Sequence, residues 1–450
     1  MSSLSSYGYN NNNNYKYSYS NNKQKKKFFS ETGNKVTGIT STYDYNHNNK
    51  PSSNANIYNK NTFPESYGKN SLSKSVMPIY SYEDLNEKYN NEYFDNKINK
   101  YNKYDYNNES NSNSNLINRE LNSIITSTIG LTNLGNTCFM NTCLQNLIHS
   151  EDFIKRLISK KDAINRSTPI SYYFFNLCKE LAKSTRSVSP NKFKEKFGLK
   201  HHLFAGYGQN DTQEFCRVLL EDMNTELNEV KKKKPYIELK TYGKSKIQCD
   251  REFDENFKGR ENSIIMDSFY GQIINIFTCK CGFKDYSFQK VLDLPLLLQN
   301  NNNSVKIENL LEEYFEEEEI KFETKCEKCG KKRVHKKEIK FSQPPNILIL
   351  SLQRINNRTK RKNNCCVIFP EILNIQKFLD EDCGHYNDNE YVLYGIGNHS
   401  GTINFGHYYA YIKLNDKKWY EFNDSHVRKI SEGIDTRSIT AYTLFYKKRI

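Results

Sequence analysis

The order of secondary-structure patterns along the chain constrains its fold more than any other feature. Apolar residues recur at helical spacing in three segments, 138–149, 171–183 and 211–227. Segments rich in β-branched, aliphatic and aromatic residues follow, at 264–278, 291–298, 346–352, 391–398, 408–414, 419–422 and 442–446. Helices followed by strands predict an α+β fold, in which helical and sheet layers pack against each other and leave a cleft between them.

The first 115 residues differ in composition from the rest of the chain. They are dominated by Asn, Ser, Tyr and Lys, with runs such as Asn10 to Asn14. A segment with so little aliphatic surface cannot offset the entropy cost of ordering its backbone. The composition therefore predicts a disordered tail over 1–115 and one large domain over 116–450.

Charge and cysteine content restrict the classes of partner and compartment. The 450 residues carry a formal charge of +14, but the basic residues are scattered, and the run Lys231 to Lys234 is typical of a solvated surface. This distribution does not favour a nucleic-acid partner, and only the tail leaves an RNA-associated role open. All twelve cysteines lie from Cys138 onward, and we expect neither a signal peptide nor a membrane-spanning stretch. The thiols are then expected to serve catalysis or metal binding in the cytosol or the nucleus.

One cysteine stands where a turn meets the start of a predicted helix. Gly135, Asn136 and Thr137 are turn and N-cap residue types, and Cys138 follows them directly. The positive end of the helix dipole favours a thiolate at this position. The segment alone is equally compatible with a buried, inert thiol, so the two interpretations stay open here.

A base and a group to orient it would complete a cysteine nucleophile. His407 opens a predicted strand, and Asn423 and Asp424 follow the neighbouring strand segment 419–422. Adjacent strands would bring an imidazole beside an amide or a carboxylate. A single His near a strand is more often structural and an Asn-Asp pair is more often a turn, but their combination with Cys138 is uncommon.

Taken together, these motifs resemble the ubiquitin-specific proteases, papain-like cysteine peptidases that remove ubiquitin. The similarity extends over 129–447. It comprises a Cys box at 130–147, a Gln-Asp box at 209–215, a His box in three pieces at 391–401, 406–411 and 419–425, and a closing strand at 441–446. The resemblance implies a helical thumb, a β-rich palm and zinc-pinned β fingers, the fingers being inserted at about 264–345.

The resemblance also implies roles for individual residues. Cys138 would attack the isopeptide or peptide carbonyl after the C-terminal glycine of ubiquitin and form a thioester. His407, rather than the competing His399, would take the thiol proton and later protonate the leaving amine. Asn423 matches the third triad position and Asp424 follows it, and the sequence leaves open which of the two orients the ring. Asn133 matches the side chain that donates to the oxyanion.

Substrate binding is assigned by the same resemblance to the Gln-Asp box. Asp211 and Glu214 share a helix face, and with Gln209 they would face the arginine-bearing C-terminal tail of ubiquitin. Asp211 could equally be a helix cap. The segment 400–406 is expected to be a blocking loop that closes over the tail.

Two cysteine pairs predict a structural zinc site, and no catalytic cofactor is expected. The ligands would be Cys279, Cys281, Cys326 and Cys329, since four thiolates suit a closed tetrahedral site. The first pair has one intervening residue where the family usually has two, which leaves four unmetallated thiols as the alternative. The expected partners are ubiquitin and ubiquitinated proteins, with no membrane contact. A catalytically weak ubiquitin-binding scaffold and a hydrolase of a ubiquitin-like modifier remain alternatives.

Overall fold

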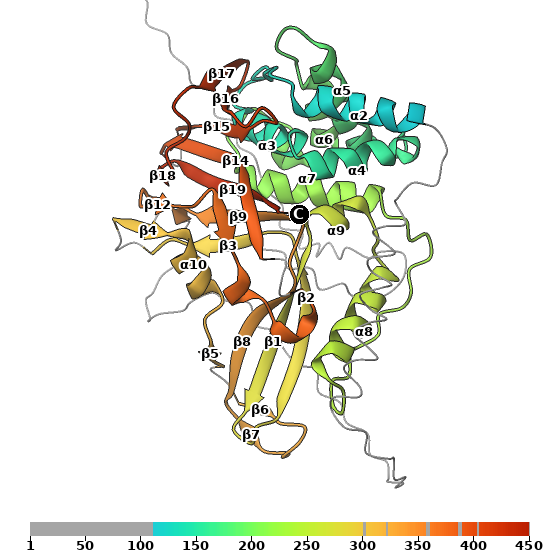
Figure 1. Ribbon diagram of the computed structural model, residues 1–450, viewed down its shortest axis with the longest axis vertical. Coiled ribbons are helices and arrows are strands. Elements are labelled where there is room, and N and C mark those ends of the chain that lie inside the picture. Colours follow the sequence, from blue (N-terminus) through green and yellow to red (C-terminus); the bar gives the residue numbers. More distant parts are fainter. Residues whose placement is uncertain are drawn as a thin grey trace, which may run out of the picture. The chain divides into compact units, whose positions relative to one another are not determined.

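Helices make up the first half of the described domain, and one of them lies between other helices and a sheet (Figure 1). The computed structural model describes residues 111–449 except 300–302, 321–322, 357–360, 386–388 and 403–404. Every residue of α3 is buried, and it contacts α4, α7 and the strands β14, β15 and β16. The helices of this half are α2 (Asn111–Ile125), α3 (Cys138–Ile148), α4 (Glu151–Ser159), α5 (Pro169–Lys183), α6 (Asn191–Lys200) and α7 (Thr212–Glu226), with short 3₁₀ turns η1 (Lys161–Ala163) and η2 (His202–Phe204).

The predicted tail lies almost entirely outside the described residues. Residues 1–110 are not described, and α2 spans the boundary that composition placed between 115 and 116. Apolar residues of α2, among them Leu121 and Ile124, are buried in the helical core. The described part of the chain therefore begins at Asn111, and the rest of the predicted tail lies outside it.

An eight-stranded sheet forms the second layer and confirms the α+β class. Its order is β17-β16-β15-β14-β19-β9-β3, with β13 also paired to β14. One face packs on the helices through Tyr394, Tyr408 and Phe445, and the other face buries Leu393 and Leu444 in a second core. The strands are β3 (Leu294–Leu297), β9 (Ile347–Gln353), β13 (Ile372–Asn374), β14 (Glu390–Gly401), β15 (Gly406–Lys413), β16 (Trp419–Asn423), β17 (His426–Ile430) and β19 (Ala441–Lys448).

A separate four-stranded sheet occupies the region predicted for the fingers. Its order is β2-β1-β8-β5, and α8 (Lys246–Lys258) covers one face, where Cys249 packs with Ile274 and Phe288. A hairpin of β6 and β7 joins β5 to β8 along the chain. The strands are β1 (Gly271–Cys279), β2 (Lys284–Val291), β5 (Glu318–Glu319), β6 (Thr324–Lys325), β7 (Lys332–Arg333) and β8 (His335–Gln343).

The strand predicted over 264–278 is wrong over residues 264–269. Residues Ile264–Phe269 form a helix, α9, and the strand begins only at Gly271. Ser263 accounts for the difference, because its hydroxyl accepts hydrogen bonds from the backbone N–H groups of Ile265 and Met266, both at 3.2 Å. A capped first turn outweighs the β preference of two consecutive isoleucines.

Small elements complete the described part of the chain. A three-stranded sheet packs near the second core, and a two-stranded hairpin, β10 and β11, follows β9. The remaining elements are β4 (Ser304–Lys306), α10 (Ile307–Tyr314), β10 (Ile355–Asn356), β11 (Arg361–Lys362), β12 (Cys366–Ile368), β18 (Arg437–Ser438), η3 (Gln376–Phe378) and η4 (Glu381–Cys383).

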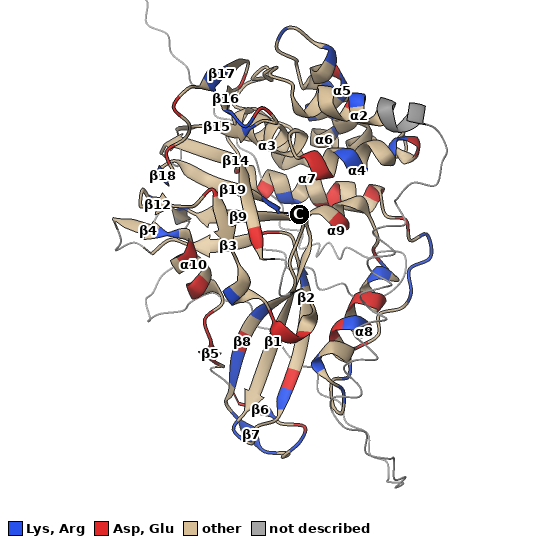
Figure 2. Ribbon diagram, in the orientation of Figure 1, with Lys and Arg blue, Asp and Glu red and all other residues tan. Residues whose placement is uncertain are grey.

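Charges of both signs are mixed on the described surface. Figure 2 shows basic and acidic residues together on α8 and on the four-stranded sheet. Lys336 pairs with Glu317 at 2.7 Å, and Lys290 pairs with Asp254 at 2.9 Å. Among the described helices, none combines the length and the apolar character needed to cross a bilayer.

Candidate active site and cysteine cluster

A tight loop places Cys138 at the first position of α3. The side-chain oxygen of Asn133 accepts hydrogen bonds from the N–H groups of Gly135 (3.0 Å) and Thr137 (3.1 Å). Gly135 and Asn136 adopt positive φ angles of 96° and 55°, a conformation that glycine and asparagine tolerate best. The loop therefore reverses the chain within a few residues and leads directly into the buried helix.

The start of α3 carries no side-chain cap. Thr137 occupies the N-cap position, but its hydroxyl accepts from the N–H of Leu134 (2.8 Å) and makes no capping hydrogen bond to the helix. First-turn N–H groups that no side chain caps give a helix start its partial positive charge. Cys138, only 4% exposed, thus lies at an electropositive position suited to an anion.

His407 lies between the nucleophile and an amide. Its Nε2 is 2.8 Å from Oδ1 of Asn423, and the thiol of Cys138 is near enough to the ring to raise its pKa. The pKa of His407 is raised to about 9. Cys138 has the largest effect, burial opposes it, and the hydrogen bond with Asn423 adds to it. A ring that keeps its proton at neutral pH can form a thiolate–imidazolium pair with the cysteine.

Asp424 lies beside this chain of hydrogen bonds and contacts different partners. Its Oδ1 accepts from Nδ2 of Asn141 at 2.8 Å, and its Oδ2 accepts from Nδ2 of Asn133 at 2.9 Å. Its backbone carbonyl accepts from the N–H of Leu131 at 2.8 Å. Of the two residues that the sequence could not distinguish, Asn423 contacts the imidazole and Asp424 holds the two asparagines.

Asn141 is a site residue that sequence reasoning missed. It lies on α3 one helical turn after Cys138, is 2% exposed, and joins Asp424 to the helix. Buried amides need hydrogen-bond partners, but α3 also carries Gln145 and Asn146, so the sequence held no signal that distinguishes Asn141 from them.

His399, the competing base, is packed away from this arrangement. Its ring centroid is 4.4 Å from that of Tyr408 and 5.8 Å from that of Tyr442. Burial, and to a smaller extent the charge of Lys362, lowers the pKa of His399 to about 4. A ring held neutral among tyrosines is poorly placed to activate a thiol, so the hydrogen bonds favour His407.

The predicted substrate residues differ in how free their side chains are. Asp211 caps α7 by accepting from the N–H groups of Gln213 (2.7 Å) and Glu214 (3.3 Å), and its second oxygen accepts from the hydroxyl of Tyr442. Burial raises the pKa of Asp211. Glu214 is exposed, and partial desolvation followed by the nearby Asp211 raises the pKa of its carboxyl. Glu214 is thus the more available of the two carboxylates.

Gln209 bridges to the hairpin that carries His407. Its Nε2 donates to the carbonyl of Gly406 at 3.1 Å, and its Oε1 accepts from the N–H of Gly406 at 3.3 Å. The predicted loop 400–406 is shorter than expected, because Ser400 and Gly401 belong to β14 and pair with His407 and Gly406. Continued strand pairing leaves 402–405 as the connection, in which Phe405 is 81% exposed.

A family model described as "Ubiquitin carboxyl-terminal hydrolase" matches residues 129–446. The chain belongs to this family. Ubiquitin carboxyl-terminal hydrolase 4 of Saccharomyces cerevisiae is 29% identical over 363 residues, covering 71% of this chain and 39% of the relative. Usp2 of Drosophila melanogaster is 30% identical and human ubiquitin carboxyl-terminal hydrolase 21 is 28% identical, each over 71% of this chain. The matched region thus spans about two fifths of the yeast relative and 34% of the Drosophila relative.

A solved structure of a DUB module has a similar fold. It is the SAGA Ubp8/Sgf11/Sus1/Sgf73 DUB module bound to ubiquitin aldehyde, with a TM-score of 0.56 and 26% identity. The alignment covers 72% of this chain and 70% of that chain.

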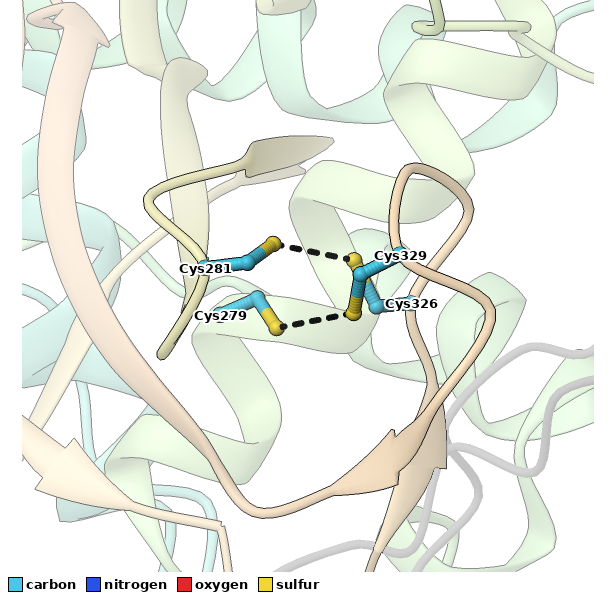
Figure 3. A group of neighbouring side chains, drawn as sticks. All are labelled: Cys279, Cys281, Cys326 and Cys329. Atoms are coloured by element: carbon cyan, nitrogen blue, oxygen red, sulfur yellow. Dashed lines mark hydrogen bonds between the residues drawn. The ribbon is translucent and has the colours of Figure 1, made fainter.

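The four predicted metal ligands converge in the structure (Figure 3). Their sulfur atoms all lie within 4.8 Å of one another, with Cys281 and Cys326 3.7 Å apart and Cys279 and Cys329 4.0 Å apart. Four sulfurs around a zinc ion at about 2.3 Å would lie roughly 3.8 Å from one another. The donor set and its spacing therefore fit a tetrahedral ion.

The short spacing of the first pair does not prevent this convergence. Cys279 is the last residue of β1, and its N–H donates to the carbonyl of Phe283 at 2.9 Å, which folds Cys281 into the hairpin turn. Gly282 and Gly330 each follow a cysteine and have positive φ angles of 82° and 69°. A left-handed glycine after each pair turns the backbone back and aims both thiols the same way.

Proposed function

We propose that the protein is a deubiquitinating cysteine protease that hydrolyses the isopeptide or peptide bond after the C-terminal glycine of ubiquitin. The observation that carries the proposal is the convergence of Cys138, at the start of a buried helix, with His407, whose ring is hydrogen-bonded to Asn423 and whose pKa is raised chiefly by Cys138. A thiol, an imidazole and an orienting amide in this order form the arrangement that thiol hydrolases need. The family match and the names of the relatives support the substrate class.

The chemistry would proceed in two acyl-transfer steps. His407 takes the proton of Cys138, and the thiolate attacks the carbonyl carbon of the terminal glycine. The tetrahedral intermediate collapses to a thioester as His407 gives its proton to the departing lysine amine. A water molecule then attacks the thioester with His407 as base, and the thiol and the free carboxylate of ubiquitin are released.

Two groups are placed to stabilise the oxyanion. Nδ2 of Asn133 uses one hydrogen on Asp424 and keeps a second for a ligand, and the N–H of Cys138 belongs to the uncapped helix start. We assign Asp424 a positioning role, because it touches Asn133 and Asn141 and not the reacting thiol. Oriented donors contribute more than free ones because they need no rearrangement during the reaction.

Recognition of the ubiquitin tail is proposed for the region before and along α7. Glu214 has the exposed carboxylate that an arginine could pair with, whereas Asp211 already caps the helix and binds Tyr442. Gln209 connects this region to the catalytic hairpin at Gly406. We therefore propose that Glu214 contacts the ubiquitin tail directly. Asp211 and Gln209 would instead maintain the shape of the binding site.

The metal site is proposed to be structural zinc. Cys279, Cys281, Cys326 and Cys329 would hold the ion as thiolates, and a closed four-sulfur shell leaves no position for substrate. The ion would fix the β1–β2 hairpin to the β6–β7 hairpin. All twelve cysteines are free thiols, which fits the proposal of a reducing compartment, cytosol or nucleus.

Labelling with ubiquitin that carries a C-terminal electrophile tests the proposal. Wild type should gain one ubiquitin mass on Cys138, and Cys138→Ala should gain none. Cys143→Ala is the matched control, because Cys143 is a buried thiol on the same helix. Ubiquitin binding without an adduct would indicate a scaffold, and an adduct only with a ubiquitin-like probe would indicate another modifier; either result would overturn the proposal.

A further inference from the structure

Strand β14 extends beyond the end of its neighbour β19. The pairing of these strands ends at Asn398 and Ala441, after which the N–H of His399 donates to the carbonyl of Thr440 at 2.8 Å. On the other side, β14 stays paired with β15 as far as Gly401. The N–H and C=O groups of a strand residue point to the same side, and alternate residues share that side. The carbonyls of His399 and Gly401 therefore point toward the β19 side of β14, beyond the first residue of β19.

A lysine from another hairpin occupies that place. Nζ of Lys362, on β11, donates to the carbonyl of His399 at 2.7 Å and to that of Gly401 at 3.3 Å. Lys362 is half-buried, and burial together with the charge of Arg354 lowers its pKa to about 8. One ammonium group thus replaces the missing strand as the partner of two carbonyls.

Buried contacts anchor the base of this hairpin. The guanidinium of Arg354 is fully buried and donates to the carbonyls of Ala441 (2.6 Å), Cys365 (2.8 Å) and Asn363 (3.0 Å). Arg354 therefore ties the start of β19 to the segment that follows Lys362. Because Arg354 fixes the base of the β10–β11 hairpin, Lys362 on that hairpin can restrain the end of β14.

The strand end that Lys362 holds is the support of the catalytic histidine. Ser400, between the two bonded carbonyls, is paired with His407, and Gly401 is paired with Gly406. Gln209 holds Gly406 from the opposite direction, from the segment before α7. The end of the β14–β15 hairpin is thus held by Gln209 on one side and by Lys362 on the other. Lys362 belongs to no motif noted in the sequence.

We propose that Lys362 is a positioning residue for the deubiquitinating reaction, which keeps His407 within hydrogen-bond reach of Cys138 by holding the end of β14. The inference rests on the proposed function. Lys362 contacts neither the thiol nor the imidazole through any hydrogen bond found in the described residues, so its effect on them is transmitted through the strand pair.

The test compares Lys362→Met with two other variants. Lys362→Arg keeps a donor able to reach both carbonyls, and Lys340→Met removes a lysine of the four-stranded sheet that also donates to one backbone carbonyl, that of Lys377 at 2.9 Å. Two assays are run on the 450-residue chain and on each variant. The first gives the rate of alkylation of Cys138 by iodoacetamide at pH 6.5, and the second gives kcat and KM on ubiquitin with a fluorogenic C-terminal amide.

Lys362→Met should lower both the alkylation rate and kcat by about 10- to 100-fold, since small misplacements of reacting groups cost this much. Lys362→Arg should restore most of both rates, KM should change less than kcat, and Lys340→Met should match wild type. Lys362→Met with wild-type alkylation and kcat would overturn the positioning role. Alkylation needs no ubiquitin, so wild type that is alkylated but cleaves no ubiquitin substrate would overturn the proposed function alone.

Discussion

Replacing Asp424 by asparagine separates the two neighbouring residues that the sequence could not distinguish. Both carboxylate oxygens of Asp424 accept from amide N–H groups, one from Asn133 and one from Asn141. An asparagine of the same shape has only one oxygen, so its NH₂ group must face one of the two donors. The contact between His407 and Asn423 is not touched by this change.

The expected loss follows from the oxyanion geometry. Removing one oxyanion donor costs about 100- to 1000-fold in kcat. Asp424→Asn misorients Asn133 without removing it, so we expect the lower end, about 100-fold or about 2.7 kcal/mol of transition-state stabilisation. The loss should be in kcat with little change in KM, because a carbonyl becomes an oxyanion only in the transition state.

A double-mutant cycle with Asn133→Ala is the decisive assay. If Asp424 acts through Asn133, adding Asp424→Asn to Asn133→Ala should lower kcat by less than threefold further, about 0.6 kcal/mol. Alkylation of Cys138 should stay at the wild-type rate in Asp424→Asn and fall in Asn423→Ala. Multiplicative losses in the double mutant, or slow alkylation in Asp424→Asn, would refute the reasoning.

Three further predictions concern the rest of the site. The kcat/KM of wild type should fall as pH rises through about 9, where His407 loses its proton. Asn423→Ala should move this fall to lower pH, because the hydrogen bond with Asn423 raises the pKa of His407. A fall at the same pH in the variant would contradict the role of Asn423. Cys281→Ser should reduce bound zinc to well below one ion per chain by elemental analysis and lower Tm, and wild type without zinc would disprove the metal site. Glu214→Gln should raise KM for ubiquitin substrates. Asp211→Ala should instead lower the free energy of unfolding by about 1 kcal/mol, because α7 loses its N-cap. Steady-state kinetics and urea denaturation on both variants test this, and a raised KM only in Asp211→Ala with lost stability only in Glu214→Gln would contradict it.

Features set by neighbouring residues were predictable from the sequence. Apolar spacing located the helices α3, α5 and α7, because helical periodicity is a property of a few consecutive turns. Enrichment in β-branched, aliphatic and aromatic residues located most strands of the large sheet. The strand predicted at 264–278 was wrong at its start, where the hydroxyl of Ser263 caps a helix. The segments of the Cys box and the two cysteine pairs were likewise recognisable as local patterns.

Contacts between segments distant in the chain were decided only by tertiary structure. Asn423 and Asp424 are neighbours with similar side chains, and strand alternation followed by a positive φ at Asp424 sends one to His407 and the other to Asn133. Lys362 reaches the end of β14 only because β19 begins at Ala441 and does not extend alongside the last residues of β14. Strand register and strand length depend on the packing of the whole sheet, so a sequence read locally determines which groups are available, and the assembled sheet determines which of them meet.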